Sequence, residues 1–212
     1  MLPERVNMSQ QSTSEFVVYI THVEPDDIYL KIWAQMDKQA ATAIEQYIFP
    51  LIEQFNQGYG CPSKTNRLMV GSLCCARFRT EGYYRAKIVS VRPDGMIVVQ
   101  FIDYGNMEAL SLNDIHLLDN IRGAEPLQAY PAMATEFTLL NVLPVNGVWD
   151  NRTIESIKKS LCYNEYRALV QMMNNHCLIK LWYNNEDFSE LLVKERMALP
   201  ATLQDMFRYN FL

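Results

Sequence analysis

Four aromatic residues and one asparagine follow one another at short spacing in a β-rich stretch of the sequence. They are Phe78, Tyr84, Phe101, Tyr104 and Asn106. Ring faces attract cations, so rings around one slot can bind a quaternary ammonium or guanidinium group, with each contact contributing roughly 0.5–2 kcal/mol. A single ring in a small barrel is typically a core residue. The complete set, with an asparagine where a core prefers an apolar residue, favours a cation-binding pocket.

Short β-strands are expected to position these residues. Between residues 70 and 118 the sequence reads as four or five short strands, with turns at Gly82 and at residues 93–95. Strands this short and this closely spaced predict a small closed barrel. The rings then stand at neighbouring loop ends at one mouth of the barrel. Gly105 is expected to turn the chain so that Asn106 reaches inward.

The sequence on both sides of this region predicts a second unit of strands and helices. Two strands within residues 16–34 precede a helix that Asp37 can cap, and Pro50 is expected to bend or break that helix. Residues 132–142 predict a strand and residues 151–162 a helix, followed by a strand pair and a closing helix. The small barrel is therefore expected to interrupt an αβ unit.

Composition narrows the possible functions. The chain has 212 residues, 49% hydrophobic residues and a net charge of -5, which allows a substantial core and argues against a protein that binds the DNA or RNA backbone. The cysteines form no C-x-x-C pair, so we expect reduced thiols in a cytosolic compartment and no metal site. We also expect no cofactor and no membrane segment, since neither a signal peptide nor a long apolar stretch is present.

Two stretches carry a resemblance to a known family. "ARFRTEGYYRAKI" followed by "VVQFIDYGNMEAL" resembles a Tudor domain, in which F-x5-Y-R-A precedes F-[IV]-D-Y-G-N. The surroundings resemble the extended Tudor form, over about residues 15–205. The resemblance implies a mostly β fold with helices (α+β), in which a small five-stranded Tudor barrel is inserted into a staphylococcal-nuclease-like, OB-type αβ unit. The expected boundaries are a disordered lead-in at 1–14, the first part of the nuclease-like unit at 15–60, the barrel at 68–120 and the second part at 121–212.

The resemblance also implies a function. In the family the aromatic cage holds methylated arginine, usually symmetric dimethylarginine in the arginine-rich tails of Piwi-class Argonaute proteins. Carried over position by position, the walls would be Phe78, Tyr84, Phe101 and Tyr104, with Asn106 as the hydrogen-bonding residue. The implied protein is a scaffold in the piRNA pathway of RNA-mediated gene silencing, located in the cytoplasm in perinuclear germ granules (nuage). Its partner would be an arginine-methylated Piwi-class tail.

The acidic residues allow two interpretations. Asp103 could supply a counter-charge for the ligand, but an acid between two wall residues on a strand points to the opposite face, and we prefer pairing with an arginine such as Arg85 that braces the barrel. The acidic clusters at 24–27 and 186–190 could be solvated turns, or they could steer an arginine-rich tail.

Two other functions remain open from sequence. A nuclease needs a carboxylate cluster for a divalent metal, but the flanking stretches offer scattered acids and three separated histidines, and a fold alone does not transfer activity. We therefore predict no catalytic residue and no direct nucleic-acid binding, with a nuclease-like or RNA-binding domain as one alternative. The other alternative is a protein-interaction scaffold that binds its partner without methylation.

Overall fold

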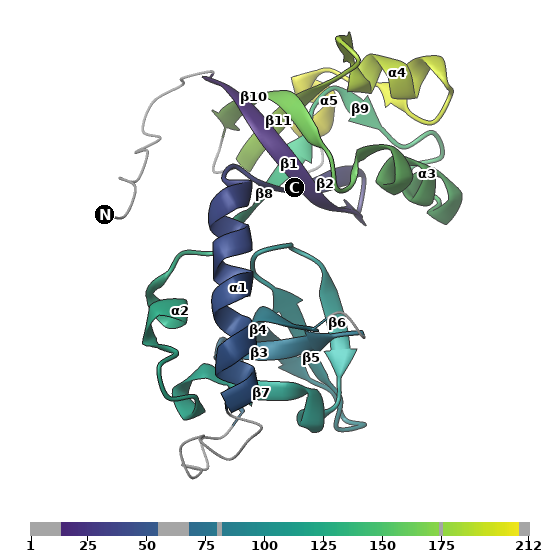
Figure 1. Ribbon diagram of the computed structural model, residues 1–212. Coiled ribbons are helices and arrows are strands. Elements are labelled where there is room, and N and C mark those ends of the chain that lie inside the picture. The colour runs from purple at the N-terminus through teal and green to yellow at the C-terminus, as the bar shows by residue number, and fades with distance from the viewer. Residues whose placement is uncertain (1–13, 55–67, 80–81, 174–175, 208–212) are drawn as a thin grey trace. The chain divides into compact units, whose positions relative to one another are not determined.

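The computed structural model describes residues 14–54, 68–79, 82–173 and 176–207, which form two compact units (Figure 1). One, here called the inserted unit, runs from Asp37 to Thr135. The other, the flanking unit, takes the described residues up to Met36 and from Glu136 onward. The expected insertion of one unit into another is thus confirmed. Cys61 and the expected lead-in, apart from Ser14, lie outside the described residues.

A five-stranded antiparallel sheet forms the barrel of the inserted unit, in the order β6-β5-β4-β3-β7. The strands are β3 (Leu73–Phe78), β4 (Gly82–Val91), β5 (Ile97–Phe101), β6 (Met107–Leu110) and β7 (Ile115–Leu117). The turn between β4 and β5 contains Gly95 at φ 82°, a left-handed conformation that glycine adopts without a Cβ penalty. Short helices follow the last strands: η2 (Leu112–Asp114), η3 (Leu118–Asn120) and α2 (Glu125–Ala129).

Alternation along the strands builds the barrel core. In β5, Ile97, Val99 and Phe101 are buried while the residues between them are partly exposed, the period of two expected of a sheet with one covered face. These side chains pack with Ala86 and Ile88 of β4 and with further apolar residues of β3 and β7. Phe101 is therefore a member of the core as well as a predicted wall of the pocket.

The helix α1 (Lys38–Gln54) belongs to the inserted unit. Its buried Ile44, Ile48 and Ile52 pack in one cluster with side chains from β3, η3 and α2. The expected boundaries instead grouped this helix with the nuclease-like stretch at 15–60. The sequence pattern shows that a helix has an apolar face, but it does not show which neighbour covers that face.

Both ends of α1 bear on the predictions. Asp37 caps the helix, since its Oδ1 accepts a hydrogen bond from the Ala40 amide at 2.9 Å. Pro50 does not end the helix, which continues to Gln54. The expected break is wrong because the buried Ile48 and Ile52 on either side of Pro50 anchor the last turns to the unit's core.

The flanking unit is a second sheet, with strands in the order β10-β1-β2-β8-β11-β12 and an additional β10–β11 pairing that closes it on itself. Its strands are β1 (Ser14–Asp26), β2 (Tyr29–Gln35), β8 (Ala134–Leu139), β10 (Glu165–Met173), β11 (His176–Tyr183) and β12 (Glu186–Asp187). Around it lie β9 (Val142–Leu143), α3 (Asn151–Leu161), α4 (Phe188–Lys194), β13 (Leu199–Pro200) and α5 (Leu203–Phe207). This closed sheet with helices agrees with the predicted OB-type αβ unit. The turn expected at 174–175 lies outside the described residues.

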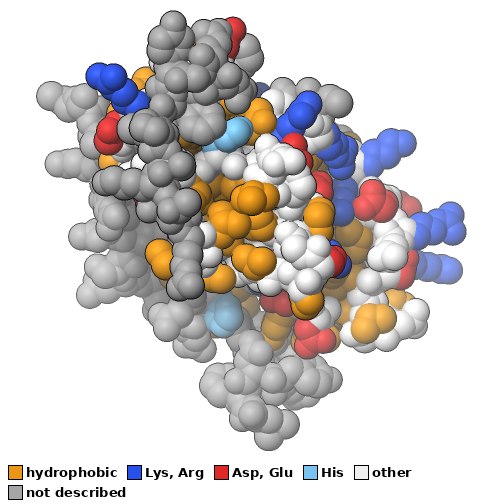
Figure 2. All heavy atoms as spheres, turned by 90° about the horizontal axis from the view of Figure 1, so that it is seen from below, with side chains coloured by type: hydrophobic (Ala, Val, Ile, Leu, Met, Phe, Trp, Pro, Cys, Tyr) orange, Lys and Arg blue, Asp and Glu red, His pale blue; other side chains and the backbone are white. Residues whose placement is uncertain are grey.

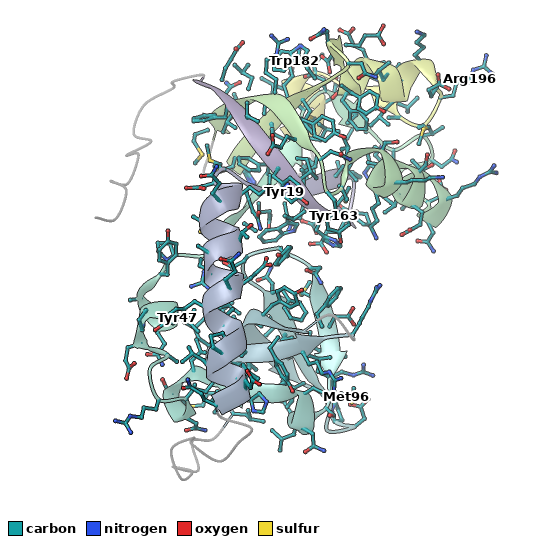
Figure 3. All side chains as sticks on the ribbon, in the orientation of Figure 1. Tyr19, Tyr47, Met96, Tyr163, Trp182 and Arg196 are labelled. Carbon is teal, nitrogen blue, oxygen red and sulfur yellow. The ribbon has the colours of Figure 1, made fainter. Side chains whose placement is uncertain are left out.

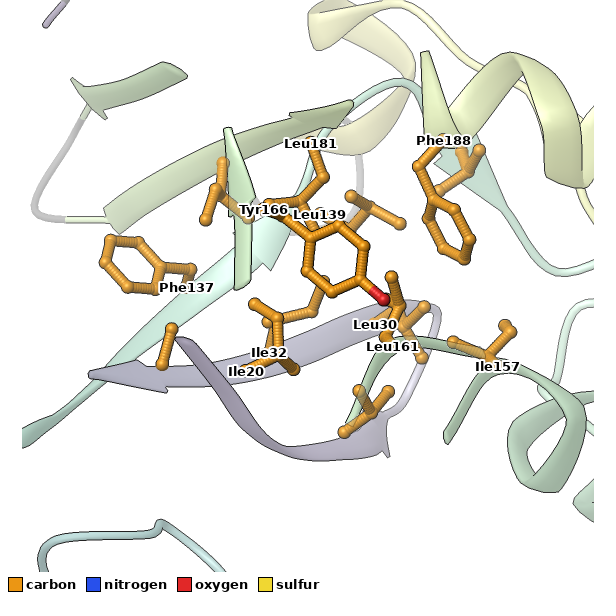
Figure 4. Close-up of a cluster of buried hydrophobic side chains, with 14 of the residues drawn as sticks. Ile20, Leu30, Ile32, Phe137, Leu139, Ile157, Leu161, Tyr166, Leu181 and Phe188 are labelled. Carbon is orange, nitrogen blue, oxygen red and sulfur yellow. The ribbon is translucent and has the colours of Figure 1, made fainter. Parts of the chain in front are cut away.

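The core of the flanking unit is built from strand and helix side chains together. Figure 4 shows Tyr166 of β10 among Ile20, Leu139 and Leu181, with Leu161 of α3 nearby. The Tyr166 hydroxyl donates a hydrogen bond to the Ser160 carbonyl at 2.7 Å, so the ring can be buried without an unsatisfied polar group.

Charge and hydropathy on the surface agree with the composition. On the face drawn in Figure 2, Lys and Arg side chains lie beside Asp and Glu side chains along one margin, and a hydrophobic group lies near the middle. Within the described part of the chain, no helix is both long and apolar enough to cross a membrane.

One helix position gives a pH-dependent prediction. Burial, and secondarily the charge of Asp103, raise the pKa of Glu45 on α1. An acid with a raised pKa in the folded state costs stability when it ionises, so Glu45→Gln is expected to stabilise the protein near neutral pH. The gain should disappear as the pH falls below the ordinary carboxyl value of 4.5, where the carboxyl group is neutral in both states. Urea unfolding of both proteins across this range measures the effect; an equal difference at all pH values would contradict it.

Candidate functional site

The predicted pocket residues lie at the ends of three neighbouring strands of the inserted unit. Phe78 is the last residue of β3 and pairs with Gly82, the first of β4. Tyr84 follows on β4, and Phe101 ends β5, which pairs with β4. Tyr104 lies in the turn after Phe101, so the antiparallel order brings residues distant in sequence to one end of the sheet.

The four rings form one connected set, and neighbouring rings meet at nearly right angles. The Phe78 and Phe101 centroids are 5.3 Å apart with planes at 78°, and those of Tyr84 and Tyr104 are 5.5 Å apart at 85°. Tyr84 lies 6.3 Å from both Phe78 and Phe101, at 84° and 87°. Edge-to-face contact is the preferred geometry of ring pairs in cores. Here it also places Phe78, Tyr84 and Phe101 like three faces at the corner of a box.

Burial separates Phe101 from the other three rings. Phe101 is only 1% exposed, whereas Phe78, Tyr84 and Tyr104 are partly exposed and pack against the barrel core from outside. The predicted wall at Phe101 therefore lies at the base of the set, and the other three rings stand around it. One of them already contacts a cation, because the Arg79 guanidinium carbon lies 5.0 Å from the centroid of Phe78.

The turn after β5 is fixed by backbone hydrogen bonds. The Phe101 carbonyl accepts from the amides of Tyr104, at 3.1 Å, and Gly105, at 2.7 Å, and the Phe101 amide donates to the Asn106 carbonyl at 3.0 Å. Gly105 has φ 94°, a value that a residue with a Cβ rarely adopts. This turn sets the positions of Tyr104 and Asn106 relative to Phe101. Within the described residues, the side-chain amide of Asn106 makes no hydrogen bond, so both of its polar atoms can serve a ligand.

Behind the turn lies a buried ion pair. The Arg85 side chain is 0% exposed and that of Asp103 is 5% exposed, and two parallel hydrogen bonds join them: Nε to Oδ2 at 2.9 Å and Nη2 to Oδ1 at 2.6 Å. Asp103 therefore does not act as a counter-charge in the pocket; it pairs with Arg85, the interpretation preferred from sequence. A planar guanidinium suits such bidentate pairing.

The ion pair also binds the chain segment that leaves the barrel. The remaining donors of Arg85 reach the carbonyls of Leu127 (2.8 Å), Tyr130 (2.7 Å) and Pro131 (2.8 Å). Asp103 Oδ1 accepts from the Met133 amide at 3.0 Å. All five N–H groups of the guanidinium are thus used. Sequence reasoning missed these partners, since they are backbone groups, which carry no signal of their own.

The acidic clusters have structural roles in part. Glu24 accepts a hydrogen bond from Trp33 Nε1 at 3.2 Å, and the hydrogen bond from His22 is the largest of the causes that lower its pKa. Asp187 caps α4 through the Ser189 amide and pairs with Lys180 at 2.9 Å. These acids are therefore more than solvated turn residues. Across the described segments, no three His, Cys, Asp or Glu side chains lie close enough together to hold a metal ion.

Comparison with known proteins identifies the family. A family model for the Tudor domain matches residues 10–141, well over half of the chain. The chain belongs to the Tudor-domain family. Tudor domain-containing protein 1 of Oryzias latipes is 27% identical over 138 residues, which is 62% of this chain and 12% of that protein. This Tudor chain therefore spans about an eighth of that relative, and smaller shares of other curated relatives it matches.

Solved structures show that the fold is that of an extended Tudor domain. The human TDRD1 extended Tudor domain, solved with a symmetrically dimethylated peptide, matches with a TM-score of 0.71 at 22% identity, covering 92% of this chain and 94% of that one. The extended Tudor domain of Drosophila melanogaster Papi, solved as a variant with a Piwi N-terminal peptide, matches with a TM-score of 0.70 at 18% identity, covering 89% of this chain and 100% of that one. The recognised family and the expected fold class are therefore confirmed.

Proposed function

We propose that this Tudor domain is a binding module that reads dimethylated arginine, in the symmetric form. The observation that carries the proposal is the box of four rings with the Asn106 amide beside it. Two of the solved extended Tudor structures described above contain peptides, and one of those peptides is symmetrically dimethylated.

The ring angles indicate where a flat cation would fit. Phe78 and Tyr104 each meet Tyr84 at nearly a right angle, so they can face each other across it, with Phe101 as the base. A guanidinium that enters this slot contacts two ring faces at once, and each such contact contributes roughly 0.5–2 kcal/mol. Its N–H group can donate to the oxygen of Asn106, which directs the ligand in a way that rings cannot.

Methylation strengthens these contacts without removing the charge. Added methyl groups lower the cost of removing water from the guanidinium and add apolar contact, at about 25 cal/mol per Å² of area buried. Each gain is small, so a peptide with one modified arginine is expected to bind at roughly micromolar affinity or weaker, equivalent to about -8 kcal/mol or less favourable.

We further propose a partner and a setting. The partner is an arginine-methylated tail of a Piwi-class Argonaute protein, and the domain acts as a scaffold in piRNA-pathway assembly, in cytoplasmic germ granules. The support is the Piwi peptide in the Papi structure and the similarity to Tudor domain-containing proteins.

Nuclear magnetic resonance spectroscopy can locate the binding site directly. On titration with a dimethylarginine peptide, the amide signals of Tyr84, Gly105 and Asn106 are expected to shift in proportion to occupancy. Signals of α3 in the flanking unit serve as an internal reference for a non-specific change. Shifts confined to residues away from the ring set would contradict the proposal.

Asn106 gives a prediction about ligand type. Trimethyllysine carries a cation but no N–H group, so it cannot donate a hydrogen bond to Asn106. Asn106→Ala is expected to weaken dimethylarginine binding by about 1–2 kcal/mol and to leave trimethyllysine binding almost unchanged. Titration of two peptides that differ only in this residue measures the change in preference. An equal loss for both ligands would mean that Asn106 shapes the pocket and does not bind the guanidinium.

We also propose that the domain has no enzymatic activity. The scattered acids and the family's role as binding modules support this proposal. The purified chain is expected to leave single-stranded RNA and DNA intact in the presence of magnesium, calcium or manganese. Cleavage that is reproducible across preparations, and lost on replacing one acid of the flanking unit, would show a catalytic site.

A further inference from the structure

The flanking unit contains an open groove with a chemistry different from that of the ring set. Its volume is about 710 Å³, and it lies between the end of α3, the start of β10 and the turn after β11. The lining residues are Lys159, Ser160, Asn164, Glu165, Tyr166, Arg167, Trp182, Tyr183, Asn184 and Asn185. A volume of this size accommodates a ligand comparable to a few peptide residues.

A cation stacked on an aromatic ring forms part of the lining. Arg167 of β10 pairs directly with Trp182 of β11 in the sheet, and its guanidinium carbon lies 4.6 Å from the Trp182 ring (Figure 3). Lys180 lies 5.4 Å from the same ring and is neutralised by Asp187 at 2.9 Å. The indole is thereby held between two long side chains. The stacked guanidinium is held flat while its N–H groups point outward, the arrangement that suits bidentate binding of an anion.

Two cations of the lining have no acidic partner in the described part of the chain. Arg167 makes its ring contact only, and Lys159 makes no ion pair, whereas the adjacent Lys158 pairs with Glu155 at 3.1 Å. Glu165 is the acidic residue among the lining side chains, so the cations exceed the acids there. This excess is local, because the whole chain carries a net charge of -5.

We propose that this groove binds an anionic peptide segment, with carboxylate or phosphorylated side chains contacting Arg167 and Lys159. The amide side chains of the three lining asparagines and the hydroxyl of Ser160 provide hydrogen-bonding groups that match a peptide backbone. An arginine-rich tail is excluded from the groove by its own charge. The groove is therefore a second binding site, independent of the methylarginine proposal.

Charge also decides between a peptide and RNA. Backbone binding of a nucleic acid requires several phosphate contacts at once, each made by a cation. Two unpaired cations in an acidic protein give a polyanion too few contacts to offset the repulsion from the rest of the chain. A short segment that places one or two anionic groups in the groove meets the attraction and avoids most of the repulsion.

The test uses the full chain and labelled peptides in fluorescence anisotropy. Three peptides of equal length alternate glycine with glutamate, with glutamine or with phosphoserine, and a single-stranded oligouridine of similar charge is the fourth probe. We expect saturable binding of the glutamate or phosphoserine peptide, weakened by added salt, and at least tenfold weaker binding of the glutamine peptide. Which anionic peptide binds more tightly identifies carboxylate or phosphate as the source of the charge.

Matched variants distinguish the groove from net charge. Lys159→Gln/Arg167→Gln is expected to lower affinity at least tenfold, while Arg152→Gln/Lys194→Gln, which removes the same charge from exposed positions on α3 and α4, should change it less than twofold. Both are surface variants, and circular dichroism checks that they fold. Absence of saturable peptide binding, an equal loss in both variants, or tighter binding of oligouridine through the same two residues would each overturn the proposal.

Discussion

Arg85→Met is expected to lower the free energy of unfolding by about 3–5 kcal/mol, the typical cost of removing one partner from a buried ion pair. The change leaves Asp103 as a buried carboxylate without its guanidinium partner, and it removes the donors to three backbone carbonyls. Urea unfolding followed by fluorescence or circular dichroism measures the loss. Lys87→Met, an exposed position on the same strand, is the matched control and should change stability by less than about 0.5 kcal/mol.

A second variant separates lost packing from lost pairing. Arg85→Met/Asp103→Leu removes both charges, so it should be less destabilised than the sum of the two single variants. If the losses simply add, the two side chains contribute independently and the ion pair does not brace the turn. An Arg85→Met protein as stable as the control would contradict this part of the account altogether.

Tyr104→Ala is expected to weaken binding of a dimethylarginine peptide by about 1–2 kcal/mol, or roughly 5- to 30-fold, because it removes one face of the slot. Tyr104 is the most direct choice among the rings, since it is partly exposed and lies in a turn. Phe101→Ala would also empty a buried core position, at a cost of about 3–5 kcal/mol in stability, so any loss of binding would be mixed with unfolding.

The matched control for Tyr104 is another tyrosine of the same unit. Tyr47 is 43% exposed on α1 and donates to the Gly123 carbonyl at 3.2 Å (Figure 3). Tyr47→Ala should leave peptide affinity unchanged, and calorimetric titration of both variants with one peptide makes the comparison. Equal affinity of Tyr104→Ala and the native protein would mean that the ring set does not contact the guanidinium.

Much of the inserted barrel could be predicted from the sequence, because its signals are local. Alternation in β5 and the turn at Gly95 define a hairpin within a few residues, and "FIDYGN" contains both the strand end and the glycine that the turn requires. The position of Asp103 between two wall residues was enough to favour Arg85 as its partner. These inferences depend on spacing along one or two strands.

Other features depend on contacts that no local pattern encodes. The packing of α1 on the barrel, the burial of Phe101 at the base of the ring set and the backbone acceptors around Arg85 follow from how distant segments meet. The groove beside Trp182 was missed for the same reason. Arg167 and Trp182 are well separated along the chain, and they become neighbours only through the register of β10 and β11.

The central claim, that the domain reads methylated arginine, is tested most directly by calorimetric titration of the native protein. Two arginine–glycine peptides are used, identical except that one carries a symmetric dimethylarginine. The account predicts saturable binding of both, tighter for the methylated peptide by about one methyl contact or more, on the order of 0.8 kcal/mol per buried group. Equal affinity for the two peptides would contradict the claim and would favour a scaffold that binds its partner without regard to methylation.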